Sequence, residues 1–483
     1  MTWDWSTVTA VLSALLIAYW VVVAIVVVTD DRDPTTTLAW LLVLLALPGV
    51  GLFFYVMFGR NWKKRAARDP EVAARAAAAA PTLARIRADH AQVHEEALAA
   101  AEATGYDKLI RLIERTDGAT VLPAHNVELL VNGQAKFDAL KADLAAANDT
   151  INIQYFIWER DELTAELTEI LLERLAAGVE VRMLNDWAGN VMYKKDEIKR
   201  LQRAGMRFHS DVTDLRKLNY RNHRKMVVID GTRGYTGGIN VGQEYIDGGT
   251  RFPSWRDTHV RFDGPAVMEL QKLFVRRWMD VDGEDLHTER FFPASYPEDG
   301  ARVFTQTVAT GVDVAWDPAT RAHGVAMANA HSRIWIQSPY LVPTPDIQST
   351  LIDAALSGVD VRFMMTGMPD KRIAWWAAET FFEQLVTAGV RVFRYTTGFF
   401  HAKTITIDGQ VSSVGTLNFD VRSLVLHKEL MTWFYDPAIA VRQEELFEAD
   451  MADCEEITLD MIRGWSPARR LRNATVRLTS NLL

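Results

Sequence analysis

Two stretches of this chain carry the same polar side chains at the same spacing. The shared residues are His223, Lys225 and Asp230 in HRKMVVID, and His401, Lys403 and Asp408 in HAKTITID. The four residues between each lysine and aspartate are apolar or β-branched, which is typical of a strand. Because residues two apart on a strand point the same way, each histidine is expected beside its lysine. A base or nucleophile next to a cation suits an anionic substrate such as a phosphate.

The paired histidines fit the transfer of a phosphodiester group between two alcohols. One neutral imidazole attacks phosphorus, and a second, protonated imidazole gives its proton to the leaving alkoxide. The second imidazole then takes a proton from the incoming alcohol, so two histidines serve both steps. The lysines would hold the non-bridging oxygens, and Asn240, Asn418 and Thr416 could donate further hydrogen bonds. Such a site requires no metal and no cofactor.

Each histidine also needs an acceptor that orients its ring through the other nitrogen. Glu429 lies 28 residues after His401 and is predicted to support that half of the site. In the first half the comparable position is Asp257, with Glu244 as its rival for His223. The spacing therefore predicts one supporting carboxylate within each half.

Four other residues near the motifs are interpreted more cautiously. Asp230 and Asp408 are counted with the catalytic groups, but each precedes a glycine and is also expected to stabilise a turn. His259 and His427 each stand two residues from a supporting acid and are interpreted as packing or polar-network residues.

The charge of the chain limits its partners. The net charge of −9 disfavours a protein that mainly binds nucleic acid, because such proteins are usually basic. An anion site must therefore be built by local charge, and Arg221, Arg224 and Lys217 beside the first motif are predicted to bind anionic headgroups. The single cysteine, Cys454, excludes an intrachain disulfide and a cysteine-based metal site.

The N-terminal region is apolar enough to enter a membrane. Residues 8–28 contain no charge and would span about 30 Å as a helix. A second apolar run, residues 38–58, is interrupted by Pro48, Gly49 and Gly51, which allows a kink or a shallow hairpin. Two spans are predicted, with a buried core hairpin as the alternative. The basic cluster within residues 60–68 places the following chain in the cytoplasm.

The remaining chain is a duplication. Residues 152–186 and 333–367 each read as strand, long helix and strand, and the two motif histidines are offset by 178 residues. This order predicts an α/β fold with two similar halves, whose mixed, mostly parallel sheets are flanked by helices. The predicted parts are a membrane hairpin (1–62), a helical connector (63–105), a first catalytic half (106–290) and a second catalytic half (291–483).

At these motifs the sequence resembles the phospholipase D superfamily, whose mark is HxKx₄D followed by small residues and Asn, present twice. More narrowly it resembles the bacterial cardiolipin synthases. That likeness rests on DPTTTLAWLLVLLALPGVGLFFYVMFGRN (33–61), WRDTHVRFDGPAV (255–267), SPYLVP (338–343) and FDVRSL (419–424). Two departures are Thr416, where many members have Ser, and LHKE (426–429), where Asn-Phe-Glu is common.

The resemblance implies an enzyme of the bacterial inner membrane, with two spans and a cytoplasmic, pseudo-twofold site between the halves. It implies that two phosphatidylglycerol molecules react to cardiolipin and glycerol through a phosphohistidine. By analogy the nucleophile is His223. The partners would be these lipids and the bilayer, not nucleic acid, and a homo-oligomer stays open. The alternatives are a hydrolase of the same superfamily, a transferase with another donor or acceptor such as phosphatidylethanolamine, and a non-catalytic membrane scaffold.

Overall fold

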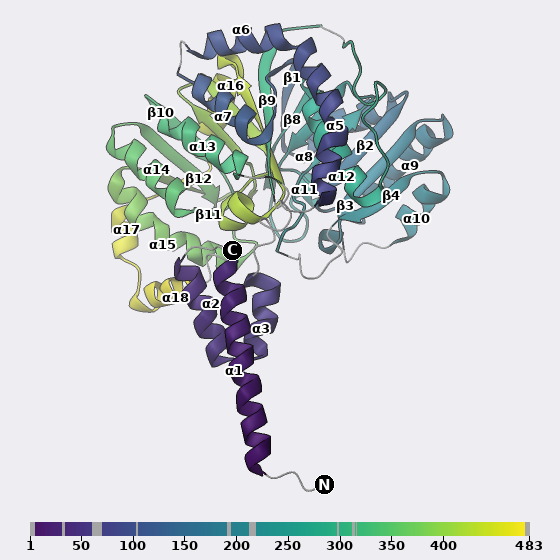
Figure 1. The fold of residues 1–483 in the computed structure, drawn as a ribbon. Coiled ribbons are helices and arrows are strands. Elements are labelled where there is room, and N and C mark those ends of the chain that lie inside the picture. Colours follow the sequence, from purple (N-terminus) through teal and green to yellow (C-terminus); the bar gives the residue numbers. More distant parts are fainter. Residues whose placement is uncertain are drawn as a thin grey trace.

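The structure is a computed structural model that describes residues 5–30, 34–59, 70–102, 105–190, 195–211, 219–296, 299–311, 314 and 316–478. Lys217 and the basic cluster within residues 60–68 lie outside the described residues. A wide catalytic part sits at one end of a narrow bundle of N-terminal helices (Figure 1).

One sheet of fifteen strands runs through both halves of the catalytic part. The first half supplies the order β4–β3–β2–β5–β6–β8–β1, and the second continues with β9–β18–β16–β15–β10–β12–β13–β19. The halves join where β1 and β9 pair antiparallel, with Leu122 opposite Thr305 and Ala124 opposite Val303. The first-half strands are β1 (Leu122–Val131), β2 (Thr150–Tyr155), β3 (Glu180–Asp186), β4 (Arg207–Asp211), β5 (Met226–Ile229), β6 (Arg233–Gly237) and β8 (Thr258–Asp263). The second-half strands are β9 (Val303–Thr310), β10 (Arg333–Gln337), β12 (Asp360–Thr366), β13 (Arg391–Tyr395), β15 (Thr404–Ile407), β16 (Val411–Gly415), β18 (Glu429–Tyr435) and β19 (Cys454–Ile457).

The sheet is mixed, as predicted, but it is not mostly parallel. Only the outer neighbours β2–β3–β4 and β10–β12–β13 pair in parallel. The inner strands form antiparallel hairpins, because each motif strand turns back at an Asp-Gly pair whose two residues both have positive φ. The strand–helix–strand pattern therefore describes only the outer part of each half, while the motif hairpins determine the centre.

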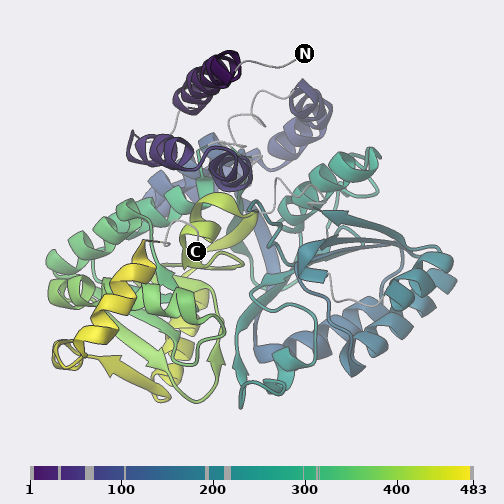
Figure 2. The ribbon, with the colours of Figure 1, turned by 90° about the horizontal axis from the view of Figure 1, so that it is seen from below.

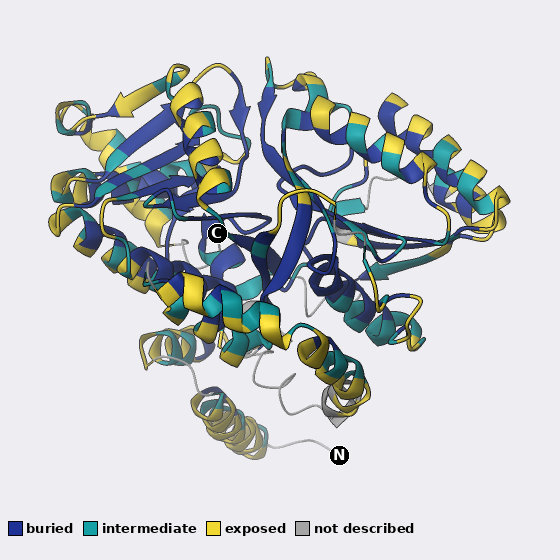
Figure 3. Cartoon of the chain, turned by 90° about the horizontal axis from the view of Figure 1, so that it is seen from above, coloured by how far each residue is buried: buried dark blue, intermediate teal, exposed yellow. Residues whose placement is uncertain are grey.

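Helices cover both faces of each half, and Figure 3 shows their exposed outer sides around a buried sheet. The first half carries α8 (Asn132–Ala145), α9 (Glu162–Ala176), α10 (Lys195–Arg203), α11 (Glu244–Asp247) and α12 (Val267–Asp282). The second half carries α13 (Pro318–Ala328), α14 (Pro345–Leu356), α15 (Arg372–Ala388), α16 (Pro437–Met451), α17 (Leu459–Arg463) and α18 (Pro467–Arg477). The predicted connector contains α5 (Pro70–Asp89) and α6 (Ala91–Glu102), and α7 (Asp107–Asp117) follows it.

The helix α7 packs with the second half, although it precedes the strands of the first half in sequence. Leu109, Ile110 and Ile113 are fully buried in the same apolar core as Ala322 and Ala326 of α13. The start of the first half at residue 106 stays a prediction, but the helix that follows this position packs in the core of the second half.

The N-terminal bundle differs from the predicted pair of membrane spans. Among the described residues only α1 (Trp5–Thr29) is long and apolar enough to cross a bilayer. The second apolar run divides into α2 (Pro34–Ala46), α3 (Val50–Phe54) and a π-helical turn (Tyr55–Gly59). The break comes at Gly49, whose φ of 83° ends the helical path. At 13 residues α2 would reach about 20 Å, too short for a span alone.

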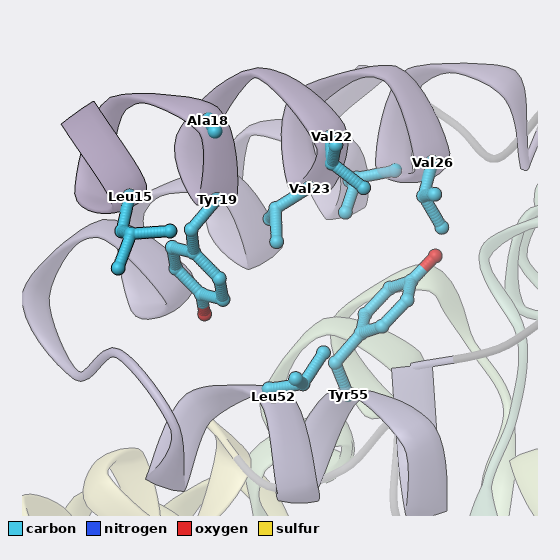
Figure 4. A pocket seen from close by; sticks show the side chains of 9 residues that line it. Leu15, Ala18, Tyr19, Val22, Val23, Val26, Leu52 and Tyr55 are labelled. Carbon is cyan, nitrogen blue, oxygen red and sulfur yellow. The ribbon is translucent and has the colours of Figure 1, made fainter.

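The short helices fold back beside α1 instead. A groove of about 400 Å³ separates α1 from Leu52 and Tyr55, with Leu15, Tyr19 and Val26 on its other wall (Figure 4). The Tyr55 hydroxyl donates to Asp30 at 3.2 Å, just beyond the end of α1. The apolar outer surface of α1 supports association of this end of the chain with a membrane.

Candidate active site at the junction of the two halves

The two motif histidines lie where the halves exchange short strands. The segment before His223 bridges in parallel to Lys428, and the His223 amide donates to the Lys428 carbonyl at 2.9 Å. In the same way β14 (Phe399–Phe400) pairs with β7 (Trp255–Arg256), and the His401 amide donates to the Arg256 carbonyl at 2.8 Å. Each histidine is therefore held against the strand that carries the other half's acid.

Because of this exchange, each motif histidine contacts a carboxylate from the other half. His223 Nδ1 lies 2.9 and 3.0 Å from the two oxygens of Glu429, and His401 Nδ1 lies 2.8 Å from Asp257 Oδ2. The expected pairing of acid and histidine within each half is therefore wrong, because each acid contacts the histidine of the other half. The supporting role of both acids stays a prediction. Glu244, the rival of Asp257, lies in α11. Since Nδ1 is engaged by a carboxylate, each ring keeps Nε2 for chemistry.

Burial favours the neutral form of both imidazoles. It lowers the pKa of His223 to about 3, and it lowers the pKa of His401 well below the ordinary value. The supporting acids differ from one another. Burial raises the pKa of Asp257 to about 6, whereas the charges around Glu429 outweigh its burial and keep its pKa below the ordinary value. The two pairs are therefore not equivalent in their affinity for a proton.

The motif lysines are buried beside their histidines. Lys225 Nζ donates to the His223 carbonyl at 2.8 Å, and Lys403 Nζ donates to the His401 carbonyl. Burial lowers the pKa of Lys225 to about 7 and that of Lys403 to about 8, and Asp257 opposes this shift at both lysines. A bound anion would raise both pKa values again, because it favours the charged amines.

The motif aspartates lie at the far end of the motif strands. Asp230 accepts the backbone amides of residues 148, 149 and 150 at 2.8–2.9 Å, just before β2. Asp408 accepts the equivalent amides of residues 331, 332 and 333 at 2.7–2.9 Å, just before β10. The four-residue strands β5 and β15 separate these carboxylates from their histidines. Each carboxylate thus fixes the segment that leads into β2 or β10, and its predicted part in the chemistry stays a prediction.

Three other polar residues of the motifs were predicted to donate further hydrogen bonds in the site. The Thr416 hydroxyl donates to Glu429 Oε2 at 2.6 Å, so it supports the acid and is not presented to a substrate. Its counterpart is Gly238, where a Cβ would collide with the carboxylate of Asp257. Asn240 donates to the Tyr245 hydroxyl at 3.2 Å. Asn418 is buried, and its Oδ1 has no hydrogen-bond partner among the described residues.

Two of the predicted headgroup-binding residues have partners within the protein. Arg224 is fully buried and donates to the carbonyls of Glu429 and Thr310 at 3.2 and 3.1 Å, so its prediction as a binding residue is wrong. Arg221 forms a two-contact ion pair with Asp186. The apolar surroundings explain both results, because a buried guanidinium needs acceptors close by.

Sequence reasoning missed a pair of buried cations that hold the exchanged strands. Arg256, just before Asp257, donates to Asp450 of the second half at 2.7 Å. Lys428, just before Glu429, lies 3.9 Å from Asp211 of the first half. A cation therefore precedes each supporting acid and reaches into the opposite half. The sequence signal for these cations was the basic–acidic dipeptide that occurs once in each half.

Two further residues near the site are His427, which was expected to be a packing or polar-network residue, and Lys136, to which no role was assigned from the sequence. The ring of His427 lies 5.9 Å from that of His223, and its Nδ1 lies 3.8 Å from Glu429 Oε1. Lys136 is fully buried, donates to the Asn240 carbonyl at 3.2 Å and lies over the Phe137 ring. Burial lowers the pKa of Lys136 well below the ordinary value, while Asp257 opposes the shift.

Comparison with known proteins agrees with this arrangement. The family model described as "Cardiolipin synthase, PLD-like domain" matches residues 140–274 and 325–451, and the model "Phospholipase_D-nuclease N-terminal" matches residues 18–60. The fold also resembles a crystal structure of phosphatidylserine synthase from Haemophilus influenzae, with a TM-score of 0.59, 15% identity and coverage of 78% of this chain and 100% of that one. Fold and site therefore define a transferase of the phospholipase D type with two histidine motifs.

The full-length relatives narrow this class. A cardiolipin synthase of Halalkalibacterium halodurans is 35% identical, with 98% of this chain and 93% of that protein covered. The major cardiolipin synthase ClsA of Bacillus subtilis is 33% identical, with 98% of each chain covered. The chain belongs to the cardiolipin synthase family.

Proposed function

We propose that the protein transfers a phosphatidyl group between two phosphatidylglycerol molecules, giving cardiolipin and glycerol. The observation that carries this proposal is the crossed pair of contacts, His223–Glu429 and His401–Asp257. They bring two oriented imidazoles from separate halves to one junction, and two-step phosphodiester transfer needs two such groups.

In the first step His223 Nε2 attacks phosphorus and the bond to the glycerol oxygen breaks. The protonated His401–Asp257 pair gives its proton to the leaving alkoxide, so free glycerol departs and phosphatidyl-His223 remains. The raised pKa of Asp257 supports this assignment, because its pair with His401 takes up a proton more readily than the Glu429 pair does. Burial lowers the pKa of His223 and of His401 alike, so the choice of His223 as the nucleophile rests on the difference between the two supporting acids.

In the second step a hydroxyl of the second phosphatidylglycerol loses its proton to His401. The resulting oxygen nucleophile attacks phosphorus, the P–N bond to His223 breaks, and cardiolipin forms. His401 ends protonated, as it began, and the cycle balances. Lys225 and Lys403 stabilise the phosphoryl oxygens in both steps, because their buried amines regain full charge beside an anion.

The substrate is a membrane lipid, and the proposed location follows from this. We place the catalytic part on the cytoplasmic face of the bacterial inner membrane, attached by α1. The basic residues within 60–68 support this side under the positive-inside rule.

The test uses the full-length protein in vesicles of phosphatidylglycerol. Cardiolipin and glycerol should appear in equal amounts, and His223→Ala and His401→Ala should each lower the rate by at least about 10²–10⁴-fold. In acid-quenched samples, mass spectrometry should find the phosphatidyl adduct on His223. An adduct on His401 would reverse the two roles.

Two other results would refute the proposal more broadly. Full activity in both histidine variants would exclude the mechanism. Phosphatidic acid as the main product would mean that water replaces the lipid acceptor and that the protein is a hydrolase.

A further inference from the structure

The C-terminal helix α18 lies on α15, at the end of the catalytic part from which the N-terminal helices extend. Figure 1 shows α18 on the lower side of the catalytic part, lying across the direction of α1. In the view from below, α18 is on the near face of the catalytic part (Figure 2). If α1 crosses the bilayer, this face is next to the membrane surface.

The side of α18 that contacts the protein is mostly polar, although Val476 packs against the apolar core of the second half. Glu379 of α15 is almost fully buried and accepts hydrogen bonds from Arg469 at 3.1 Å, Arg472 at 3.3 Å and Asn473 at 2.7 Å. Arg394 of β13 donates to the same carboxylate at 3.0 Å. The helix is therefore fixed to the protein by charge around one buried acid. This reverses the usual arrangement, in which a surface helix turns its apolar stripe inward.

The side that faces outward carries leucines. Leu471 and Leu478 are 71% and 85% exposed, and they are one heptad apart, so they share a face. Arg470 and Arg477 are also exposed, although Arg470 donates to the carbonyls of Ile462 and Arg463 at 3.0 and 3.2 Å. Arg477 lies over the Phe381 ring of α15. The helix contains four arginines and no acidic residue. Exposed leucines among arginines are typical of helices that lie at a lipid–water interface.

We propose that α18 lies in the headgroup region of the bilayer, with Leu471 and Leu478 inserted and the exposed arginines on anionic lipid phosphates. The occupant of this surface is the membrane and not a second copy of the chain. Two leucines offer far less area than a stable protein interface requires, and all the charged residues of the helix itself are arginines. The helix would give the catalytic part a second attachment and fix its tilt relative to α1.

The inference uses only the membrane association of α1 and does not depend on the proposed chemistry, so the two can fail separately. The test measures depth in the membrane with nitroxide labels on the full chain. Cys454→Ser removes the native thiol, and Leu471→Cys supplies the labelling site. Val441→Cys is the matched control, because Val441 is 44% exposed on α16, at the opposite end of the catalytic part (Figure 1).

In vesicles that contain phosphatidylglycerol, the label at 471 should be more accessible to oxygen than to a water-soluble nickel chelate. The label at 441 should show the reverse. Replacing the anionic lipid with phosphatidylcholine, or adding 1 M salt, should increase the access of nickel to the label at 471, because charge attracts the arginines to the surface.

Two results would overturn the proposal. One is equal access of nickel to the labels at 471 and 441 in anionic vesicles. The other is protection at 471 that disappears when the protein is diluted in excess lipid, since that would show contact with a second copy. Circular dichroism and the thermal midpoint of the labelled proteins check that both variants fold.

Discussion

Replacing Asp408 by Asn tests whether the motif aspartate is structural or catalytic. The carboxylate accepts three backbone amides before β10, the Ser332 hydroxyl at 2.8 Å and the Tyr106 hydroxyl at 2.9 Å. The asparagine amide has one oxygen that can still accept hydrogen bonds. Its NH₂ group cannot accept from the remaining donors, and the negative charge of the carboxylate is lost. Net hydrogen bonds to charged groups contribute about 1.5–3 kcal/mol each, so losing or weakening them should cost roughly 2–4 kcal/mol. At about 2 °C per kcal/mol for a large domain, the thermal midpoint should fall by roughly 4–8 °C.

The assay is thermal unfolding in detergent together with cardiolipin formation well below the midpoint. Turnover per folded molecule should stay close to that of the unmodified protein, because the Asp408 carboxylate touches no reacting group. Asp460→Asn is the control, since Asp460 is 94% exposed and should change stability by less than about 0.5 kcal/mol. An Asp408→Asn protein with an unchanged midpoint and no turnover would refute the reasoning and return the aspartate to the chemistry.

The stabilisation by Asp408 should also depend on pH in a defined direction. Burial acts to raise the pKa of this carboxyl, but the amides of Arg333, His331 and Ser332 lower it to about 2. The folded pKa is therefore below the ordinary value of about 3.8, so the stabilisation is complete above that pH and is lost as the pH falls towards 2. In the Asn variant this part of the acid destabilisation should be absent.

Two further predictions concern the crossed pairs. Asp450→Asn leaves the buried Arg256 without its charged partner, so the free energy of unfolding should fall by about 3–5 kcal/mol. Glu456→Gln is the control in an exposed ion pair and should lower it by at most about 1 kcal/mol. Equal thermal midpoints for the two variants would contradict this prediction. The Asp257–His401 pair must be protonated for the first step, so kcat/KM should fall as the pH rises through about 6. Asp257→Asn removes the negative charge and should move this fall to lower pH, and an unchanged profile would exclude the pair as the acid.

The sequence was sufficient to predict the duplicated frame and to select the two motif histidines as candidates for the reacting groups. Both depend on local spacing that repeats: His223 and His401 each stand two residues before a lysine, and the same strand and helix order flanks both motifs. Asp257 and Glu429 were each expected to orient a histidine, and each does contact one. Their partners were wrong because the contacts span 144 and 206 residues, while spacing along the chain favoured the nearer acid. Only the exchange of short strands between the halves determines that choice.

Other differences between expectation and structure have equally specific causes. Asp408 shares a strand with His401, and spacing alone does not reveal that the two side chains serve opposite ends of it. Arg224 is adjacent to a motif histidine, but alternation along the strand turns it into the core. The sheet was predicted as mostly parallel because the outer strand–helix–strand units are long and easily recognised. The central hairpins are short, and their turns are marked by only two residues each.

The placement of α7 has a consequence for the order in which the protein folds. Tyr106 beside this helix donates to Asp408, 302 residues later in the chain. At about 5–20 residues per second, ribosomal synthesis takes roughly 15–60 s to cover that distance. During this interval Leu109, Ile110 and Ile113 lack the core that buries them in the finished protein. Although α7 is the first part of the catalytic region to be synthesised, it is therefore among the last parts to reach its final packing. Its apolar face must be protected during this interval, when α1 has already left the ribosome.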